Sequence, residues 1–145
     1  MSGTWILDSE ALSQYLLADR SMTARLAVAL ADDIRVVISA ATIVEADHDK
    51  VHPARLAWTL SQLTVEPLTK DLAIHASKLL KDASLHGHKY AIDAMVAATA
   101  LATPERPVQI LTSDTDDLQQ LLGPRLDRTP PGHGTGPTKI KVHAV

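Results

Sequence analysis

Short runs of β-branched and aliphatic residues alternate with stretches of helical spacing along nearly the whole chain. The runs at 4–7, 34–38, 64–66, 108–111 and 139–145 predict strands, and the apolar residues between them recur three or four positions apart, which predicts helices. Parallel strands need a crossover, usually a helix, between them. The alternation therefore predicts an α/β sandwich with a mainly parallel central sheet, and 145 residues suit one domain.

Capping residues set the expected ends of the helices, because short polar side chains accept hydrogen bonds from the first free N–H groups. Helices are expected to begin after Asp8, at Ser21, at Pro53 and after Thr69 (this last one ending at 86–88), and to cover 39–50, 90–102 and 114–122. The stretch 123–138 holds four of the six glycines and four of the eight prolines, which predicts a loop before the last strand.

Charge and composition exclude several classes of protein. The net charge is −3 and the pI about 6.1, whereas a general nucleic-acid coat protein is basic. The absence of cysteine excludes disulfides, zinc–thiolate sites and thiol catalysis, and agrees with a location in the reducing cytoplasm. The chain shows no signal-peptide pattern and no apolar stretch near the ~18 residues of a membrane span, so no membrane association is expected.

Four acids stand within or directly after apolar stretches that are expected to be buried: Asp8, Glu45, Asp93 and Asp114. A carboxylate is costly to bury unless it is paired or binds a metal. Asp8 and Asp114 follow predicted parallel strands, and ligands of open α/β sheets bind at that edge. If the fold brings the four acids together, their hard oxygen donors suit Mg²⁺ or Mn²⁺.

Simpler explanations exist for three of these acids. Asp8 and Asp114 are also suitable helix N-caps, and Glu45 is near Asp47 on a helix with one solvated face. Asp93 is the most informative, because it lies in a nearly continuous apolar helix with no basic residue one turn further on.

At these positions the chain resembles the PIN-domain family, and within it the VapC-type toxins of toxin–antitoxin modules. Order, spacing and total length agree over essentially the whole chain. The matching stretches are Ile6-Leu7-Asp8-Ser9, the helix with Glu45, Asp93-Ala94-Met95-Val96-Ala97-Ala98-Thr99-Ala100, and Leu111-Thr112-Ser113-Asp114-Thr115-Asp116-Asp117-Leu118. Two features are less typical: Glu10 replaces a small or apolar residue, and 123–138 is a long connection.

The resemblance implies a three-layer α/β/α fold and an Mg²⁺- or Mn²⁺-dependent ribonuclease. Asp8 and Asp93 would then be the leading metal ligands, completed by Glu45 and Asp114. Asp117 would act directly or through water. Thr112 or Ser113 would orient carboxylates or bind a phosphate. In such enzymes a metal-activated water attacks the phosphorus, so no protein nucleophile is needed.

Basic residues near the acids are candidates for RNA contacts. His86, His88 and Lys89 precede Asp93 and could touch phosphates, although a solvated helix end explains them equally well. Arg20 and Arg25 are weaker candidates. The pair His86 and His88 could also bind a transition metal, but seven histidines in a chain of this size make such pairs common.

The resemblance also implies a homodimer and a cognate antitoxin. The early helices are rich in apolar residues, some of which could form a partner surface, although most are expected in the core: Leu12, Leu16, Leu17, Leu26 and Leu30.

Three alternatives stay open. They are an RNA-processing PIN nuclease without an antitoxin, a catalytically silent PIN-like binding module, and a phosphoryl-transfer signalling domain. The retained acids argue against the silent module. Ser113-Asp114 stands where the signalling domain would need a lysine.

Overall fold

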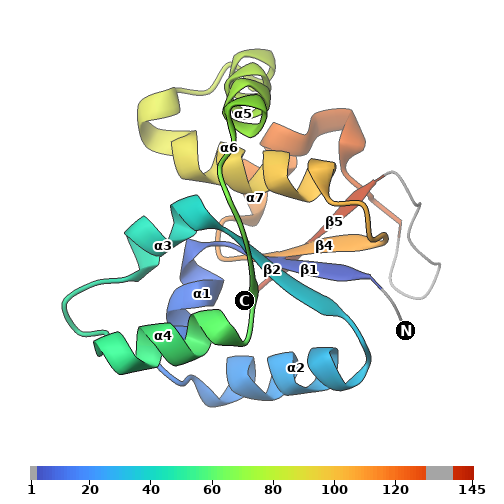
Figure 1. Cartoon of the computed structure of the whole chain (residues 1–145). Coiled ribbons are helices and arrows are strands. Elements are labelled where there is room, and N and C mark those ends of the chain that lie inside the picture. The colour runs from blue at the N-terminus through green and yellow to red at the C-terminus, as the bar shows by residue number, and fades with distance from the viewer. Residues whose placement is uncertain (1–2, 130–138) are drawn as a thin grey trace.

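The computed structural model describes residues 3–129 and 139–145, and these form a parallel sheet between two helical layers (Figure 1). The sheet order is β3-β2-β1-β4-β5, and every printed strand pair is parallel. The strands are β1 (Thr4–Leu7), β2 (Arg35–Ser39), β3 (Thr64–Glu66), β4 (Val108–Thr112) and β5 (Ile140–Ala144). The α/β/α sandwich with a parallel central sheet is therefore confirmed.

The helices divide between the two faces of the sheet (Figure 1). α1 (Ser9–Leu16), α2 (Arg20–Ala31) and α4 (Pro53–Ser61) cover one face. α5 (Lys70–Ala83), α6 (Gly87–Ala102) and α7 (Thr115–Leu122) cover the other. α3 (Ala40–Ala46) follows β2 directly and contacts both α1 and α6. α3 thus lies at the edge of the sheet where the strands end.

Each face of the sheet has its own apolar core, because successive side chains of a strand point to opposite faces. In β1, Ile6 packs in the cluster beneath α5, α6 and α7, whereas Leu7 packs with α1 and α2. Both side chains are fully buried. Burial on both sides explains why the strands read as continuous apolar runs in the sequence rather than as alternating ones.

Several expected helix ends differ from the structure. α2 begins at Arg20, and the carboxylate of Asp19 rather than Ser21 caps it by accepting the N–H of Met22 at 2.8 Å. α3 ends at Ala46, well before residue 50. α5 ends where Ser84 adopts a left-handed conformation, and Gly87 opens α6 instead of ending α5. A competing N-cap accounts for the one-residue shift at the start of α2, whereas α3 and α5 end three or more residues before their expected ends.

The Gly- and Pro-rich segment is only partly a loop among the described residues. Gly123–Arg125 forms a short 3₁₀ turn, and Leu126 bridges to Ile140 beside the last strand. Residues 130–138, the rest of that expected loop, lie outside the described residues.

Most of the apolar residues of the early helices belong to the core, as expected. Leu12, Leu16 and Leu26 are buried, whereas Leu17 and Leu30 are 54% and 42% exposed. Within the described residues, no helix is both long enough and apolar enough to cross a membrane.

Candidate metal centre

The sheet topology brings two of the four acids to neighbouring strand ends. β1 pairs with β2 on one side and with β4 on the other, and Leu7 lies opposite Leu111. The chain runs outward from β1 in both directions, which creates the switch point where open α/β sheets bind ligands. Asp8 follows β1 at this point, and Asp114 follows β4.

Asp8 is buried, with 2% of its surface exposed, and the protein satisfies its carboxylate. One oxygen accepts the backbone N–H of Ala11 at 2.8 Å, so Asp8 is the N-cap of α1 as the simpler explanation expected. The other oxygen accepts the hydroxyl of Thr112 and the N–H of Ser113. The Thr112 hydroxyl in turn accepts the N–H of Asp114 at 2.8 Å, so one short network ties the two strand ends together.

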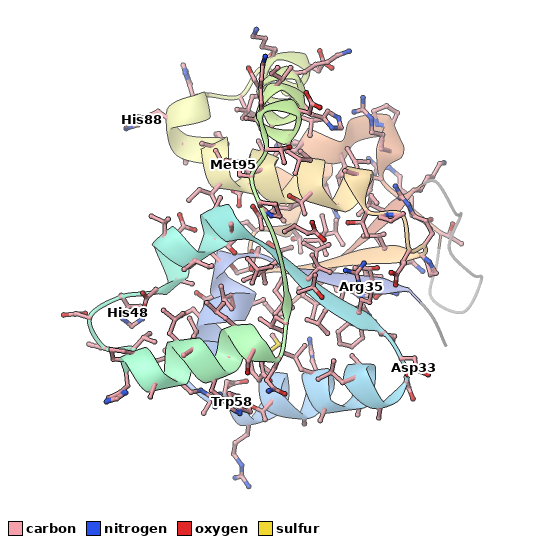
Figure 2. The ribbon with its side chains drawn as sticks, viewed as in Figure 1. Asp33, Arg35, His48, Trp58, His88 and Met95 are labelled. Carbon is pink, nitrogen blue, oxygen red and sulfur yellow. The ribbon has the colours of Figure 1, made fainter. Side chains whose placement is uncertain are left out.

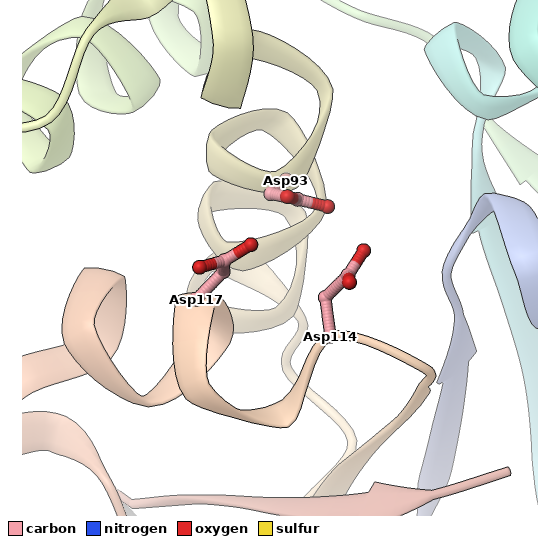
Figure 3. Close-up of side chains that lie close together, drawn as sticks. All are labelled: Asp93, Asp114 and Asp117. Carbon is pink, nitrogen blue, oxygen red and sulfur yellow. The ribbon is translucent and has the colours of Figure 1, made fainter.

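Three further carboxylates converge beside this network (Figure 3). Asp93 comes from the N-terminal half of α6, Asp114 precedes α7, and Asp117 lies in the first turn of α7. Each offers an oxygen that lies within 4.8 Å of those of the other two. We call Asp93, Asp114 and Asp117 the acidic triad. Packing of α6 against α7 places the triad, since the sequence separates Asp93 from Asp114 by a whole strand.

Glu45 reaches the same region from the third helix. It is exposed on α3, and it borders two cavities that also contain Asp93 and Asp114. Glu45 is not among the three carboxylates that lie within 4.8 Å of one another. The fold thus brings all five predicted acids to one edge, with the triad closest together.

The charges of these acids act on one another. Burial and the negative charges of Asp114, Asp8, Asp117 and Glu45 together raise the pKa of Asp93 from 3.8 to about 7. Burial raises the pKa of Asp8 as well, opposed by its three hydrogen bonds. In the part of the chain that the structure describes, no hydrogen bond or ion pair engages the triad carboxylates. Clustered acids without a counter-charge favour a bound cation.

The predicted substrate contacts fall into two groups. His88 and Lys89 border a cavity of about 300 Å³ together with Asp93, Asp114 and Asp117. Thr112 is fully buried and holds Asp8, whereas Ser113 is exposed and borders the second cavity, of about 330 Å³. Arg25 borders a different cavity, with Trp5 and His143, so the fold does not bring it to the acids.

Sequence reasoning missed four polar side chains that border the second cavity: Ser9, Glu10, Ser13 and His48. The hydroxyl of Ser9 is buried and has no hydrogen-bond partner among the described residues. Ser9 and Ser13 are four residues apart on α1, so the helical spacing places both on one face of that helix. His48 follows α3 in a loop that the sequence assigned to a helix.

The donor set fits a hard divalent cation. It consists of carboxylate oxygens from the triad, with Asp8 and Glu45 beside it and the unpaired hydroxyl of Ser9 at the same cavity. Oxygen donors of this kind suit Mg²⁺ or Mn²⁺, while the absence of cysteine removes the ligands that favour softer metals.

Comparison with known proteins gives a structural match but no sequence match. No protein-family model and no curated protein matches this sequence. The fold matches a chain in the crystal structure of VapBC2 from Rickettsia felis bound to a DNA fragment from their promoter, with a TM-score of 0.63. The match covers 98% of each chain at 13% identity.

This protein has a PIN-like α/β/α fold. The resemblance inferred from the four acidic stretches therefore predicted the fold correctly, although only 13% of residues are identical to the matched chain. A structural match at 13% identity establishes the fold. In this PIN-like fold the acids lie at the carboxyl edge of the sheet, while their individual roles stay predictions.

Proposed function

We propose that this protein is an Mg²⁺- or Mn²⁺-dependent ribonuclease that hydrolyses RNA phosphodiester bonds, and that it is the toxin of a toxin–antitoxin pair. The observation that carries the proposal is the acidic triad, whose oxygens lie within 4.8 Å of one another at the switch point of a PIN-like sheet. The likeness to a chain of a VapBC2 structure supports it.

In this proposal Asp93, Asp114 and Asp117 hold the metal, with Asp8 and Glu45 completing the acidic site. When bound, the metal would lower the pKa of a water and stabilise charge on the leaving 3′-oxygen. The chain itself supplies the positions of the carboxylates. Thr112 and the N-terminus of α1 hold Asp8 in one orientation, and α6 and α7 hold the triad.

RNA needs local positive charge to approach an acidic site on a protein of net charge −3. Lys89 borders the same cavity as the triad and supplies that charge in this proposal, and His88 beside it offers a ring N–H to a phosphate. Ser113 is exposed beside Asp8 and offers a hydroxyl to a phosphate.

The partners are part of the same proposal. The matched structure is a VapBC2 assembly bound to promoter DNA, and we propose a cognate antitoxin and a homodimer for this chain in the cytoplasm. Leu17 and Leu30 are exposed on the helical layer of α1 and α2 and offer apolar surface to a partner. A small open reading frame beside the gene, and its product co-purifying with this chain, would support the antitoxin.

The decisive test incubates total RNA with the wild-type protein and with Asp93→Asn, in Mg²⁺, in Mn²⁺ and in EDTA. We expect cleavage by the wild type in metal only, and a loss of at least about 100-fold in Asp93→Asn. Asp116→Asn is the matched control, because Asp116 is an exposed acid on α7 outside the triad.

Equal cleavage by wild type and Asp93→Asn, or cleavage that survives EDTA, would contradict the proposed site. No cleavage by a folded wild type in either metal would favour a PIN-like binding module. Cleavage lost in Asp93→Asn but retained in Asp116→Asn would assign the activity to the triad.

A further inference from the structure

The two cavities at the acids adjoin each other. Both are bordered by Glu45, Asp93 and Asp114, so the two cavities lie next to each other across the acidic site, and we call them together the acidic groove. One arm continues to His88 and Lys89 at the N-terminus of α6. The opposite arm continues past Asp8 to the loop between α3 and α4.

The two arms differ in how they can bind a phosphate chain. A strand that crosses the six acids that border the two cavities needs hydrogen-bond donors or cations on both sides of them. The α6 arm has Lys89 and His88. In the opposite arm, His48 is the one side chain with a nitrogen among the described residues that border it, the others being acids, serines and an alanine.

The loop fixes the orientation of the His48 ring. Its Nδ1 accepts the backbone N–H of Lys50 at 3.2 Å, so the proton of the neutral ring lies on Nε2. Nδ1 also lies 3.9 Å from a carboxylate oxygen of Asp49, whose side chain is 97% exposed, and solvent screens that pair. The His48 side chain is 38% exposed and borders the second cavity. Figure 2 shows it in the segment between α3 and α4.

We propose that His48 is a substrate-binding residue that donates its Nε2–H to a phosphate of the RNA strand, on the opposite side of the acids from Lys89. The assignment rests on the proposed ribonuclease function. It places the strand along the acidic groove, from the N-terminus of α6 across the triad to the α3–α4 loop. A single-stranded substrate fits, since one strand has its phosphates free to follow a narrow groove.

The same loop contains a matched control. His52 precedes α4, and its Nδ1 accepts the N–H of Ala54 at 3.1 Å, which repeats the arrangement of His48 and Lys50. His52 borders neither arm of the acidic groove. Asparagine at either position keeps an acceptor for the N–H two residues later and removes the Nε2–H. His48→Asn and His52→Asn therefore make the same chemical change in the same loop, and only His48 borders the groove.

The experiment measures cleavage and binding of a 5′-labelled single-stranded RNA of mixed sequence by wild type, His48→Asn, His52→Asn and Asp93→Asn. Cleavage is followed in Mg²⁺ and Mn²⁺, and binding by fluorescence anisotropy in Ca²⁺. We expect His48→Asn to raise KM and the dissociation constant about tenfold with a small change in kcat. His52→Asn should match the wild type in KM, kcat and RNA binding. The melting temperatures of the wild type, His48→Asn and His52→Asn should agree.

If the wild type cleaves RNA and His48→Asn matches it in KM and in binding, the His48 assignment is wrong while the ribonuclease proposal stands. A wild type that neither cleaves nor binds RNA overturns both. If the wild type binds RNA without cleaving it, a dissociation constant raised in His48→Asn but not in His52→Asn would support the contact between His48 and RNA. Equal dissociation constants for the wild type and His48→Asn would overturn it. An equal loss in His48→Asn and His52→Asn would assign the effect to the loop and overturn the direct contact.

Discussion

Asp8 and Asp93 belong to the same cluster of acids, but their carboxylates differ in the hydrogen bonds that they accept. Asp8, at the junction of β1 and α1, is 2% exposed and accepts hydrogen bonds from Ala11, Thr112 and Ser113. Asp93, where α6 meets α7, has no such donor among the described residues and faces four other acids. The fold therefore provides hydrogen-bond donors for the Asp8 carboxylate, whereas it holds the Asp93 carboxylate among other acids without providing a donor from the described residues.

Because of this difference, one acid of the cluster is expected to stabilise the fold and the other to favour the binding of a cation. An acid that closes a hydrogen-bond network between two strand ends contributes to folding, and its position is fixed before any ligand arrives. An acid that is held among like charges weakens the metal-free protein and makes cation binding favourable. Asp8 is therefore expected to govern the stability of the fold, and Asp93 to govern its dependence on metal and pH.

The largest effect on stability is expected from Asp8→Ala. The change removes the N-cap of α1 and leaves the Thr112 hydroxyl and the Ser113 N–H without their acceptor. We expect a loss of about 3 kcal/mol in the free energy of unfolding, or roughly 10 °C in the melting temperature. Thermal unfolding in EDTA measures it. Asp8→Asn, which keeps the cap acceptor but not the acceptor of Thr112 and Ser113, should recover part of the loss. An unchanged melting temperature in Asp8→Ala would contradict the stabilising role of Asp8.

The pH dependence of the metal-free protein should follow Asp93. Its pKa is raised from 3.8 to about 7, so between these values the native state holds a proton that the unfolded chain has released. Stability therefore falls as pH rises through that window, and Asp8, whose pKa is also raised, acts in the same direction. His75 and His143, whose pKa values are lowered by burial and nearby cations, act oppositely below about 6.5.

The difference between wild type and Asp93→Asn isolates the contribution of Asp93. In EDTA, we expect the melting temperature of the variant relative to the wild type to increase between pH 5 and pH 8. Added Mg²⁺ should stabilise the wild type more at pH 8 than at pH 5, since metal and proton compete for the same carboxylates. A difference between the two proteins that does not change with pH would show that Asp93 titrates normally.

The smallest effect is expected from Thr112→Val. The change keeps the shape of a fully buried side chain but removes the hydroxyl that donates to Asp8 and accepts from Asp114. We expect a loss of about 1–2 kcal/mol. Thr99→Val is the control, because the Thr99 hydroxyl bonds only to the Met95 carbonyl of its own helix. Equal losses in the two variants would show that the Thr112 network adds nothing to the junction.

The strands, most of the helices and the fold class could be predicted from the sequence alone. Five strands and their parallel arrangement followed from the alternation of short apolar runs with helical spacing, because a strand buried on both faces must be apolar throughout. Asp93 was recognisable as unusual for a local reason, since it is an acid in an apolar helix without a nearby base. Helix ends were less predictable, as at Asp19 and Ala46, because neighbouring residues offer competing caps.

Which acids lie closest together follows from the packing of the helices and could not be predicted from the sequence. Asp117 joined Asp93 and Asp114 in the triad because α6 packs against α7, while Glu45 stayed exposed on α3. Asp8 is the N-cap of α1 and also borders the second cavity beside Asp93 and Asp114. His48 borders the same cavity from the segment that follows α3, which ends at Ala46. Distances between residues far apart in sequence depend on packing, and no local pattern encodes them.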